Sequence, residues 1–424
     1  MPRLPDSWYK ESAHPFPALP ALAGDIEADV VILGAGITGL STAIELAERG
    51  YRVVVLEASR VGFGASGRSG GQIIFGYGCE QAKLRRLLGE EAARRLFRWS
   101  VEGVELIDQR VAKYAIDCDL SRGHAHAAIR PRQVEELRRF QAELNDLDYP
   151  GTELWTQNEL RQRMASQRYR ALLYDPRSGH LHPLNYTLGL ARAAQSLGVR
   201  LFEESAVTAI ERTDPVVFHT ARGRVRAGFG VIAGNAWLRG IAPELEARIM
   251  PVGTYIAASE VLGAKRAQAL IQNAMAVADI NFVLDYFRLS SDHRLLFGGR
   301  VSYSKLAPPG LKARMRSRML AVFPQLTDVK IASAWGGYVD ISMNRAPDWG
   351  RLTPNLYYAQ GFSGHGIAAT GLAGRVIAEA IAGQSERLDC YARIRHRPFP
   401  GGPWLRTPAL VLAMAWFRLL DLRP

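Results

Sequence analysis

The sequence predicts an α/β fold, α+β overall, in which a Rossmann-like domain is interwoven with an antiparallel β-sheet domain capped by helices. Three observations support this fold class. A glycine-rich turn lies between two apolar runs at residues 28–57, β-rich segments fill residues 250–335, and a buried strand, a glycine-rich turn and a helix follow one another at residues 356–381. The first and last patterns belong to one nucleotide-binding sheet, so the β-rich stretch forms a second domain woven through the first.

The first unit has the order strand, turn, helix, strand. The apolar run Val30–Leu33 predicts a strand and leads into the sequence GAGITG at Gly34–Gly39. A helical pattern follows at Leu40–Arg49, and the apolar run Val53–Leu56 predicts the second strand. This order and spacing are typical of a dinucleotide-binding βαβ unit. The similar GFGASG at residues 62–67 lacks a preceding strand of its own, so it does not indicate a second such unit.

Each glycine of the first turn has a separate task. Gly34 permits the tight turn, Gly36 lets the backbone approach a pyrophosphate, and Gly39 lets the helix pack closely on the sheet. The phosphates then lie at the helix N-terminus, where free N–H groups and the helix dipole favour an anion. Glu57 follows the second strand, where its carboxylate can bind both hydroxyls of an adenosine ribose. A carboxylate there repels a 2′-phosphate and therefore disfavours NADP.

The rest of the chain alternates between the two expected domains, because helical and strand-like patterns follow one another without a repeat. Helical patterns stand at 80–113, 131–147, 184–197, 311–323 and 367–381, and strand patterns stand at 198–204, 230–234 and 356–359. We expect an N-terminal arm at 1–27, a discontinuous nucleotide-binding domain at 28–80, 175–249 and 340–390, a second domain at 81–174 and 250–339, and a C-terminal tail at 391–424.

Composition narrows the class of protein. The chain has 424 residues, of which 48% are hydrophobic and 22% charged, as is typical of globular proteins with a large core. The net charge of +12 is spread along the chain without a recognised nucleic-acid-reading motif, so no nucleic-acid partner is expected. Cys79, Cys118 and Cys390 show neither metal-ligand nor disulfide spacing, which predicts no metal site and a reducing, cytoplasmic location.

The C-terminal tail carries an apolar run, Ala409–Phe417, flanked by arginines. Its nine residues are too few to span a bilayer, which takes about 17–25. Two interpretations stay open. The segment is a helix docked on the protein's own surface, or residues 404–424 make peripheral contact with the inner face of a membrane, where arginines meet anionic headgroups.

Two further glycine-rich segments, GFGASGRSGGQ at Gly62–Gln72 and GFSGHG at Gly361–Gly366, follow the first in order. With these three segments the chain resembles the D-amino-acid oxidase-like family of FAD-dependent oxidoreductases, which includes glycine oxidase and sarcosine oxidase. Within that family it is similar to the γ-glutamylputrescine oxidoreductases, notably in HPLNYTLGLARAA from His182 and LDYFRLSSDHRLLFGGR from Leu284.

The resemblance implies a nucleotide-binding domain of the glutathione-reductase type that holds FAD. Two departures from the γ-glutamylputrescine pattern, Ser69 in place of Asn and Ser342 with Asn344 in place of Thr and Asp, bear on the substrate and not on FAD. Neither His nor Cys occurs in Ala65–Gln72, and Cys390 lies beyond the last helix of the domain, so we expect FAD to bind non-covalently. The residues expected to bind it are Gly34, Gly36, Ile37, Thr38, Gly39, Glu57, Ala58, Gly64, Ala65, Ser66, Gly67, Arg68, Gly70, Gly71, Gln72, Val207, Ala233, Gly234, Gly361, Gly364, His365, Gly366 and Ile367.

The implied chemistry is oxidation of the C–N bond of an amine or amino acid, such as a γ-glutamylated polyamine in polyamine catabolism. Hydride passes to flavin N5 and water hydrolyses the imine, so positioning supplies most of the rate. The helix N-terminus after GFSGHG would stabilise negative charge on the reduced flavin. On the substrate side, an arginine of the β-rich domain would bind a carboxylate in bidentate fashion. The catalytic or substrate-binding candidates are Tyr255, Tyr286, Arg288, Arg300, Trp335 and His365, each with a packing role as its alternative.

Oxygen or a quinone is the expected electron acceptor. The alternatives are a D-amino-acid or other quinone-linked amino-acid dehydrogenase at the membrane surface, and a non-catalytic FAD-binding subunit. A flavin monooxygenase or NAD(P)H-dependent reductase would need a second nucleotide site or another route for NADPH to reduce the flavin, and the sequence contains one complete fingerprint.

Overall fold

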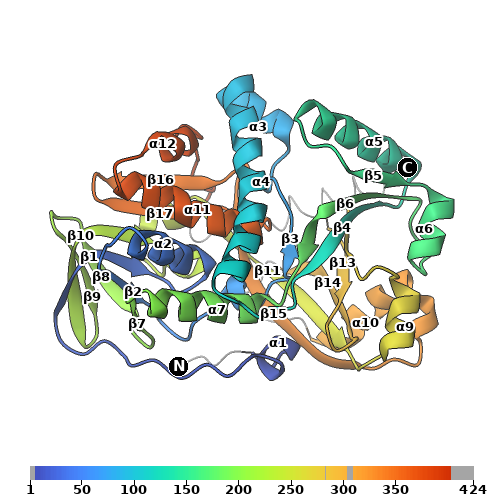
Figure 1. Ribbon diagram of the computed structural model, residues 1–424, viewed down its shortest axis with the longest axis horizontal. Coiled ribbons are helices and arrows are strands. Elements are labelled where there is room, and N and C mark those ends of the chain that lie inside the picture. Colours follow the sequence, from blue (N-terminus) through green and yellow to red (C-terminus); the bar gives the residue numbers. More distant parts are fainter. Residues whose placement is uncertain (1–4, 282, 303–308, 403–424) are drawn as a thin grey trace.

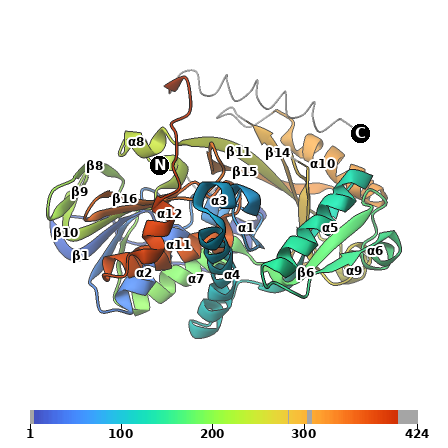
Figure 2. The same ribbon diagram turned by 90° about the horizontal axis from the view of Figure 1, so that it is seen from above.

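The computed structural model describes residues 5–281, 283–302 and 309–402. The described chain forms two lobes that lie side by side, each built on its own β-sheet (Figures 1 and 2). The long helix α4 (Glu90–Lys113) runs between the lobes, and the short N-terminal helix α1 (Trp8–Glu11) lies near their junction. The chain passes from one lobe to the other several times, as the interwoven arrangement requires.

The first lobe contains the mostly parallel sheet that the sequence predicts. Its central strands β1, β2, β7, β10 and β17 are parallel, β16 is antiparallel to β17, and the β8–β9 hairpin continues antiparallel from β10. Within the described residues the sheet has eight strands, which are β1 (Ile26–Leu33), β2 (Val53–Leu56), β7 (Arg200–Phe202), β8 (Val207–Glu211), β9 (Val216–Thr220), β10 (Gly223–Ile232), β16 (Asp348–Thr353) and β17 (Leu356–Gln360).

Both faces of this sheet are covered, as its continuous apolar strands require. Successive residues of a strand point to opposite faces. Val30 and Ile32 therefore pack into the core beneath the helices, whereas Val31 packs into the core on the opposite face. The covering helices are α2 (Ile37–Ala47), α7 (Pro183–Ser196) and α11 (Gly366–Ile381), with α12 (Glu386–Ala392) beside them. The short α8 (Pro243–Glu246) packs on the other face, where its Leu245 shares a core with Val31.

Helices α2 and α11 lie side by side in unusually close contact (Figure 1). A Cβ added to Gly374 on α11 would lie 2.5 Å from Cβ of Ser41 and 2.7 Å from the backbone nitrogen of Thr42, both on α2. Only a glycine leaves room for this approach. The N-termini of the two helices consequently open toward the same region of the molecule.

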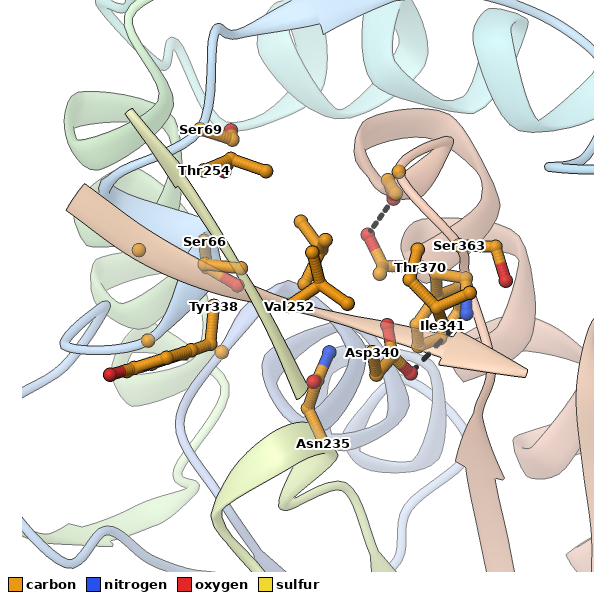
Figure 3. A pocket seen from close by; sticks show the side chains of 18 of the residues that line it. Ser66, Ser69, Asn235, Val252, Thr254, Tyr338, Asp340, Ile341, Ser363 and Thr370 are labelled. Carbon is orange, nitrogen blue, oxygen red and sulfur yellow. Dashed lines mark hydrogen bonds between the residues drawn. The ribbon is translucent and has the colours of Figure 1, made fainter. Parts of the chain in front are cut away.

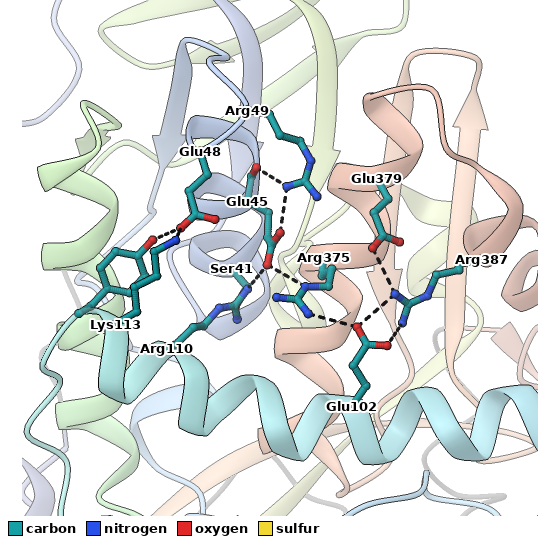
Figure 4. A network of polar contacts seen from close by, with 11 residues as sticks. Ser41, Glu45, Glu48, Arg49, Glu102, Arg110, Lys113, Arg375, Glu379 and Arg387 are labelled. Carbon is teal, nitrogen blue, oxygen red and sulfur yellow. Dashed lines mark hydrogen bonds and ion pairs between the residues drawn. The ribbon is translucent and has the colours of Figure 1, made fainter.

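Charged side chains tie α2, α4 and α11 together (Figure 4). The Glu45 carboxylate on α2 accepts hydrogen bonds from Arg110 on α4 at 3.2 Å and from Arg375 on α11 at 2.9 Å. Glu102 on α4 extends the network to Arg375 and Arg387. Burial raises the pKa of Glu45, but the nearby arginines outweigh it, so that the pKa is lowered overall and the carboxylate stays ionised.

The second lobe contains a mostly antiparallel sheet. Within the described residues its strands are β3 (Gln72–Ile73), β4 (Ser121–Ala128), β5 (Glu153–Trp155), β6 (Ala171–His180), β11 (Ile249–Ser259), β12 (Ala276–Asp279), β13 (Tyr286–Leu289), β14 (Leu295–Ser302) and β15 (Ile331–Ser342). Its helices are α3 (Gln81–Leu88), α5 (Pro131–Asp146), α6 (Gln157–Arg163), α9 (Ala264–Leu270) and α10 (Leu311–Val322).

The structure refines the expected elements in three places. The helical stretch 80–113 is two helices, because Gly89 adopts φ = 88° between them. Strands β4 and β12 pair in parallel, an exception to the expected antiparallel sheet, because they are joined through the other lobe and not by a hairpin. Strand β6 continues to His180 in the second sheet, so the return to the first lobe comes after residue 180 and not at 175.

The apolar run 409–417 lies outside the described residues, and so does the rest of the tail from residue 403. Among the described residues, no single helix has the length and apolar composition to cross a membrane, although the bent pair α11 and α12 passes that test together.

Candidate cofactor and substrate site

A large cavity lies where the two sheets meet. The parallel strands β1, β2, β10 and β17 end at the same edge of the first sheet, which is where open α/β sheets bind ligands. The cavity has a volume of about 1340 Å³ and is also lined by β4, β11, β12 and β15 of the second sheet. Pockets for one small molecule usually measure about 300–1,000 Å³. This cavity therefore has room for a dinucleotide and a substrate together.

At one end of the cavity, the Glu57 carboxylate is fixed by backbone groups. Its Oε2 accepts the N–H of Ala35 at 2.9 Å and its Oε1 accepts the N–H of Ser59 at 2.9 Å. Burial raises the pKa of Glu57, and the two N–H groups act in the opposite direction. Each carboxylate oxygen has a further lone pair, so Glu57 can still accept ribose hydroxyls. Ala58 and Val207 line the same end.

The first turn of α2 opens into the cavity. Gly34 adopts φ = 104°, and a Cβ there would lie 2.6 Å from the carbonyl oxygen of Ala233. Gly36 precedes the helix without a side-chain cap, and Ser66 Oγ accepts the N–H of Ile37 at 3.0 Å. Because Gly36, Ile37 and Thr38 line the cavity, this helix N-terminus can receive a phosphate.

The second glycine segment presents buried polar groups without protein partners. Arg68 Nε donates to the carbonyl of Phe63 at 2.6 Å, but its Nη2 is buried and has no hydrogen-bond partner within the described chain. The buried Ser69 Oγ also has none among the described residues. Unpaired buried polar atoms are costly and point to a missing ligand. The remaining cavity-lining residues here are Gly64, Ala65, Ser66, Gly70, Gly71 and Gln72.

The third segment presents a second helix N-terminus, that of α11. Gly364, His365, Gly366 and Ile367 line the cavity, and the buried His365 Nδ1 has no partner in the part of the chain that is described. Asp340 at the end of β15 holds the preceding turn, because its Oδ2 accepts the N–H groups of Gly361 and Phe362.

Figure 3 shows Asp340 beside Asn235 and near Ser363. The Asn235 side chain hydrogen-bonds to Asp340, and the N–H of Ser363 donates to the backbone carbonyl of Asp340 at 3.0 Å. Burial raises the pKa of Asp340 to about 7. The start of α11 is therefore held in place by β15.

These features fit the dinucleotide that the sequence predicts. Two helix N-termini, an acid placed for a ribose, and buried polar atoms of Arg68, Ser69 and His365 that have no partner among the described residues all belong to one cavity. Ala233 and Gly234 also line it.

Three of the predicted cofactor residues, Gly39, Gly67 and Gly361, do not line the cavity. A Cβ on Gly39 would lie 1.9 Å from the oxygen of Gly34, and one on Gly67 would lie 2.3 Å from the oxygen of Gly62. Gly361 adopts φ = 78°. All three glycines therefore shape the backbone that supports the cavity lining.

The structure divides the predicted substrate residues into those that line the cavity and those that do not. Tyr286 and His365 line the cavity, whereas Tyr255, Trp335 and Arg288 do not. Trp335 Nε1 donates to the carbonyl of Arg68 at 3.0 Å, which supports the second glycine segment from outside. Tyr255 packs in the core of the second lobe.

Arg288 is a buried structural residue and not a cavity cation. Its guanidinium donates to the carbonyls of Gly70 at 2.8 Å and Leu181 at 2.9 Å and to the hydroxyl of Tyr9 at 3.2 Å. These contacts direct its donors into the protein, because the strand buries the side chain at the lobe junction. Arg300 lies on β14, and its side chain falls outside what the structure describes.

The structure also places residues in the cavity that the sequence did not nominate. Lys83 comes from α3, His124 and His126 from β4, Asp279 from β12, and Arg345 from the loop after β15. The sequence contained a signal for the two histidines. The pattern His-x-His on a strand directs both imidazoles to one face. No comparable signal links the other three, because they are far apart in the chain.

The histidines of this cavity are neutral at pH 7. Burial lowers the pKa of His126 to about 4 and that of His365 to about 3, and it also holds the pKa of His124 well below its usual value. Burial has the opposite effect on Asp279, whose pKa rises to about 7.

Comparison with known proteins agrees with this geometry. The family model described as "DAO: FAD dependent oxidoreductase" matches residues 29–380. Gamma-glutamylputrescine oxidoreductase of Escherichia coli (strain K12) is 42% identical over 416 residues, covering 98% of this chain and 98% of its own. Probable oxidoreductase OrdL of Haemophilus influenzae is 41% identical over 421 residues, covering 98% of this chain and 97% of its own.

The crystal structure of glycine oxidase from Bacillus cereus superposes with a TM-score of 0.71 at 22% identity, covering 87% of this chain and 99% of that chain. This likeness confirms the predicted fold class.

Proposed function

The chain belongs to the DAO family of FAD-dependent oxidoreductases, and from this premise we propose that it oxidises the C–N bond of a γ-glutamylputrescine-like amine. The main support is the full-length similarity to the Escherichia coli gamma-glutamylputrescine oxidoreductase, combined with one cavity that extends from the dinucleotide end to the second sheet. The protein is an enzyme, and FAD is its cofactor.

We assign the holding of FAD to the three glycine segments. Glu57 would hold the ribose hydroxyls, the N-terminus of α2 would hold the pyrophosphate, and Arg68, Ser69 and the N-terminus of α11 would contact the flavin end. When bound, FAD supplies a two-electron acceptor for the hydride that leaves the carbon beside the amine nitrogen.

The chain's own residues contribute positioning and charge. The dipole and free N–H groups of α11 favour negative charge at the start of that helix. Asp340 fixes the position of this helix start by accepting the N–H groups of the preceding turn. Tyr286 forms a wall against Gly70 and Gly298, where an added Cβ would lie 2.7 Å and 2.0 Å from its ring. The neutral histidines leave an amine in the cavity free of imidazolium repulsion.

Anaerobic mixing with γ-glutamylputrescine tests this function. We expect the flavin absorbance to bleach with a saturable dependence on the amine, and the C–N bond to yield an imine that water converts to an aldehyde and ammonia. Mixing with NADPH is the control, since NADPH would bleach the flavin absorbance of a reductase. The non-catalytic alternative would be supported if no amine or amino acid of a broad panel reduced the bound flavin.

FAD is held without a covalent bond in this proposal. Ala65–Gln72 contains neither His nor Cys, and none of the described cysteines lines the cavity. Acid precipitation checks this, with yellow FAD expected in the supernatant. Colour that stays in the pellet would indicate a link through a cavity histidine.

In this proposal the electron acceptor is oxygen or a quinone, and the protein is cytoplasmic. If a quinone is the acceptor, residues 404–424 make peripheral contact with the membrane. Deleting Trp404–Pro424 separates the two acceptors. An oxidase releases peroxide in proportion to amine with or without this segment. A quinone-linked enzyme loses membrane pelleting and quinone reduction when the segment is removed.

A further inference from the structure

The short N-terminal helix α1 lies near the junction of the lobes (Figure 1) and is fixed to both of them by polar contacts. Trp8 Nε1 donates to the Asp292 carboxylate at 3.2 Å, in the turn between β13 and β14 of the second lobe. Ser12 Oγ lies 3.1 Å from Nε2 of His182, which caps the N-terminus of α7 in the first lobe. Because Trp8 and Ser12 stand at the two ends of α1, this helix bridges the lobes.

Tyr9 lies between these two anchors and is fully buried. Its hydroxyl accepts a hydrogen bond from Arg288 Nη2 at 3.2 Å, and its ring meets the Trp335 ring edge-on, with the centroids 5.1 Å apart. Aromatic pairs in this arrangement stabilise a structure beyond the area that they bury. Tyr9 therefore helps to fix two side chains that come from β13 and β15 of the second sheet.

These two side chains hold the second glycine segment. Arg288 Nε donates to the carbonyl of Gly70 at 2.8 Å, and Trp335 Nε1 donates to the carbonyl of Arg68 at 3.0 Å. Arg68 and Gly70 line the cavity, whereas Arg288 and Trp335 do not. The segment is thus held from the side away from the cavity by two donors that both contact Tyr9.

Close packing leaves this segment little room to move. Gly71 adopts φ = 73°, and a Cβ there would lie 2.1 Å from the carbonyl oxygen of Leu181, which also accepts a hydrogen bond from Arg288 at 2.9 Å. A Cβ on Gly70 would lie 2.7 Å from the ring of Tyr286. A displacement of Arg288 would therefore displace the backbone that lines the cavity.

We propose that Tyr9 is a positioning residue for the flavin end of FAD and acts on the second glycine segment through Arg288 and Trp335. The inference goes beyond the proposed amine oxidation, and it rests on the part of that proposal that assigns this segment to the flavin end. Groups that are fixed before a ligand arrives bind it more tightly, because less ordering is needed on binding. Loss of Tyr9 should therefore weaken the hold on the flavin and not the hold on the adenosine.

The test compares FAD with ADP, which has the adenosine and the diphosphate but no flavin. FAD-loaded enzyme is diluted and ultrafiltered, and the free FAD in the filtrate gives the dissociation constant of FAD. ADP added to the same enzyme displaces FAD and gives the dissociation constant of ADP by competition. The absorption spectrum of the bound flavin is the second measurement.

Three variants remove the contacts in steps, and a fourth is the control. Tyr9→Phe removes the hydroxyl, Tyr9→Leu removes the aromatic ring as well, and Trp335→Phe removes the indole N–H. Tyr77→Phe is the matched control, because the buried Tyr77 hydroxyl is also hydrogen-bonded, to the Leu96 carbonyl at 2.9 Å and the Tyr391 hydroxyl at 2.6 Å, and Tyr77 does not line the cavity.

We expect Tyr9→Phe and Trp335→Phe to raise the dissociation constant of FAD by roughly 3- to 10-fold, and Tyr9→Leu to raise it by roughly 10- to 100-fold. The dissociation constant of ADP should stay within about twofold of wild type, because distant sites contribute independently. The flavin spectrum should shift in Tyr9→Leu. Tyr77→Phe should keep the wild-type ratio of the two constants and the wild-type spectrum.

Equal weakening of FAD and ADP by the Tyr9 substitutions would overturn the proposal, since it marks a purely structural role. So would a wild-type ratio of the two constants together with a wild-type flavin spectrum in Tyr9→Leu. The spectrum is measured on the loaded enzyme, so it tests the positioning even where FAD does not leave the protein. No amine takes part, so a flavin that γ-glutamylputrescine fails to bleach would overturn the proposed amine oxidation and leave the role of Tyr9 in place.

Discussion

At the scale of single residues, Asp340 shows how one buried side chain joins the two lobes. It belongs to β15 of the second sheet, is 1% exposed, and accepts backbone N–H groups from the turn that begins α11 in the first lobe. Burial raises its pKa from 3.8 to about 7, so the folded protein binds a proton that the unfolded chain releases between these values. Asp340 therefore makes the protein less stable as the pH rises.

The substitution Asp340→Asn tests this linkage. The native state binds more protons than the unfolded state between pH 4 and pH 7, so the wild type loses stability as pH rises through that window, whereas an amide does not titrate. The free energy of unfolding of D340N minus that of wild type should increase by about 2–3 kcal/mol between pH 5 and pH 8. Urea unfolding at each pH measures it. A difference that stays constant with pH would show that Asp340 titrates normally in the folded protein.

At the scale of elements, the contact between α2 and α11 aims two helix N-termini into one cavity. The substitution Gly374→Ala introduces a methyl group 2.5 Å from Cβ of Ser41. Overpacking of about 1–3 kcal/mol or more should outweigh the roughly 1 kcal/mol that alanine adds to helix stability, so the variant should unfold more easily and bind FAD more weakly.

Gly366→Ala is the control on the same helix, because its nearest neighbours lie 3.9 Å from the added methyl group. It should be at least as stable as wild type in urea unfolding. Equal stability of the two variants would mean that the helices can move apart without cost.

The buried charge network makes a second prediction for these elements (Figure 4). Glu45→Gln leaves Arg110, which is 3% exposed, without its carboxylate, and removing one partner of a buried pair costs about 3–5 kcal/mol. Glu105→Gln on α4 is the comparison, because Glu105 pairs with Arg177 at the surface, where such a pair contributes about 0–1 kcal/mol. A loss in E45Q no larger than in E105Q would contradict a structural role for the network.

At the scale of the whole molecule, the cavity lies between two sheets that share part of one hydrophobic core. A ligand that fills it contacts both lobes and binds only the folded state, so FAD should stabilise the entire chain. Free FAD at 100 times its dissociation constant should add about 2.7 kcal/mol. Thermal unfolding of the FAD-free and FAD-loaded protein measures the effect.

Hydrogen exchange identifies which parts of the chain FAD stabilises. Removal of FAD should expose the amides of residues 62–72 and 361–367, most of which line the cavity, and leave those of α5 unchanged as an internal control. Equal melting temperatures and equal exchange with and without FAD would place the cofactor elsewhere.

Much of the first lobe could be predicted because its signals are local. Val53–Leu56 is a strand with the bounds that its apolar run indicates, and Gly34 adopts the positive φ that the turn requires. The side chains of the substrate end carry no such signal. Arg288 and Trp335 have the chemistry of ligand-binding residues, but hydrogen bonds to Gly70 and Arg68 place them behind the cavity wall.

The sequence by itself determined the fold class, the family and the three glycine segments that shape the cofactor end of the cavity, because each depends on residues that are close in the chain. The tertiary structure alone decided that Lys83, His124 and Arg345 meet in one cavity and that Arg288 is directed into the protein. The physical reason is that burial, charge pairing and distance between remote segments arise only when the two sheets pack against each other.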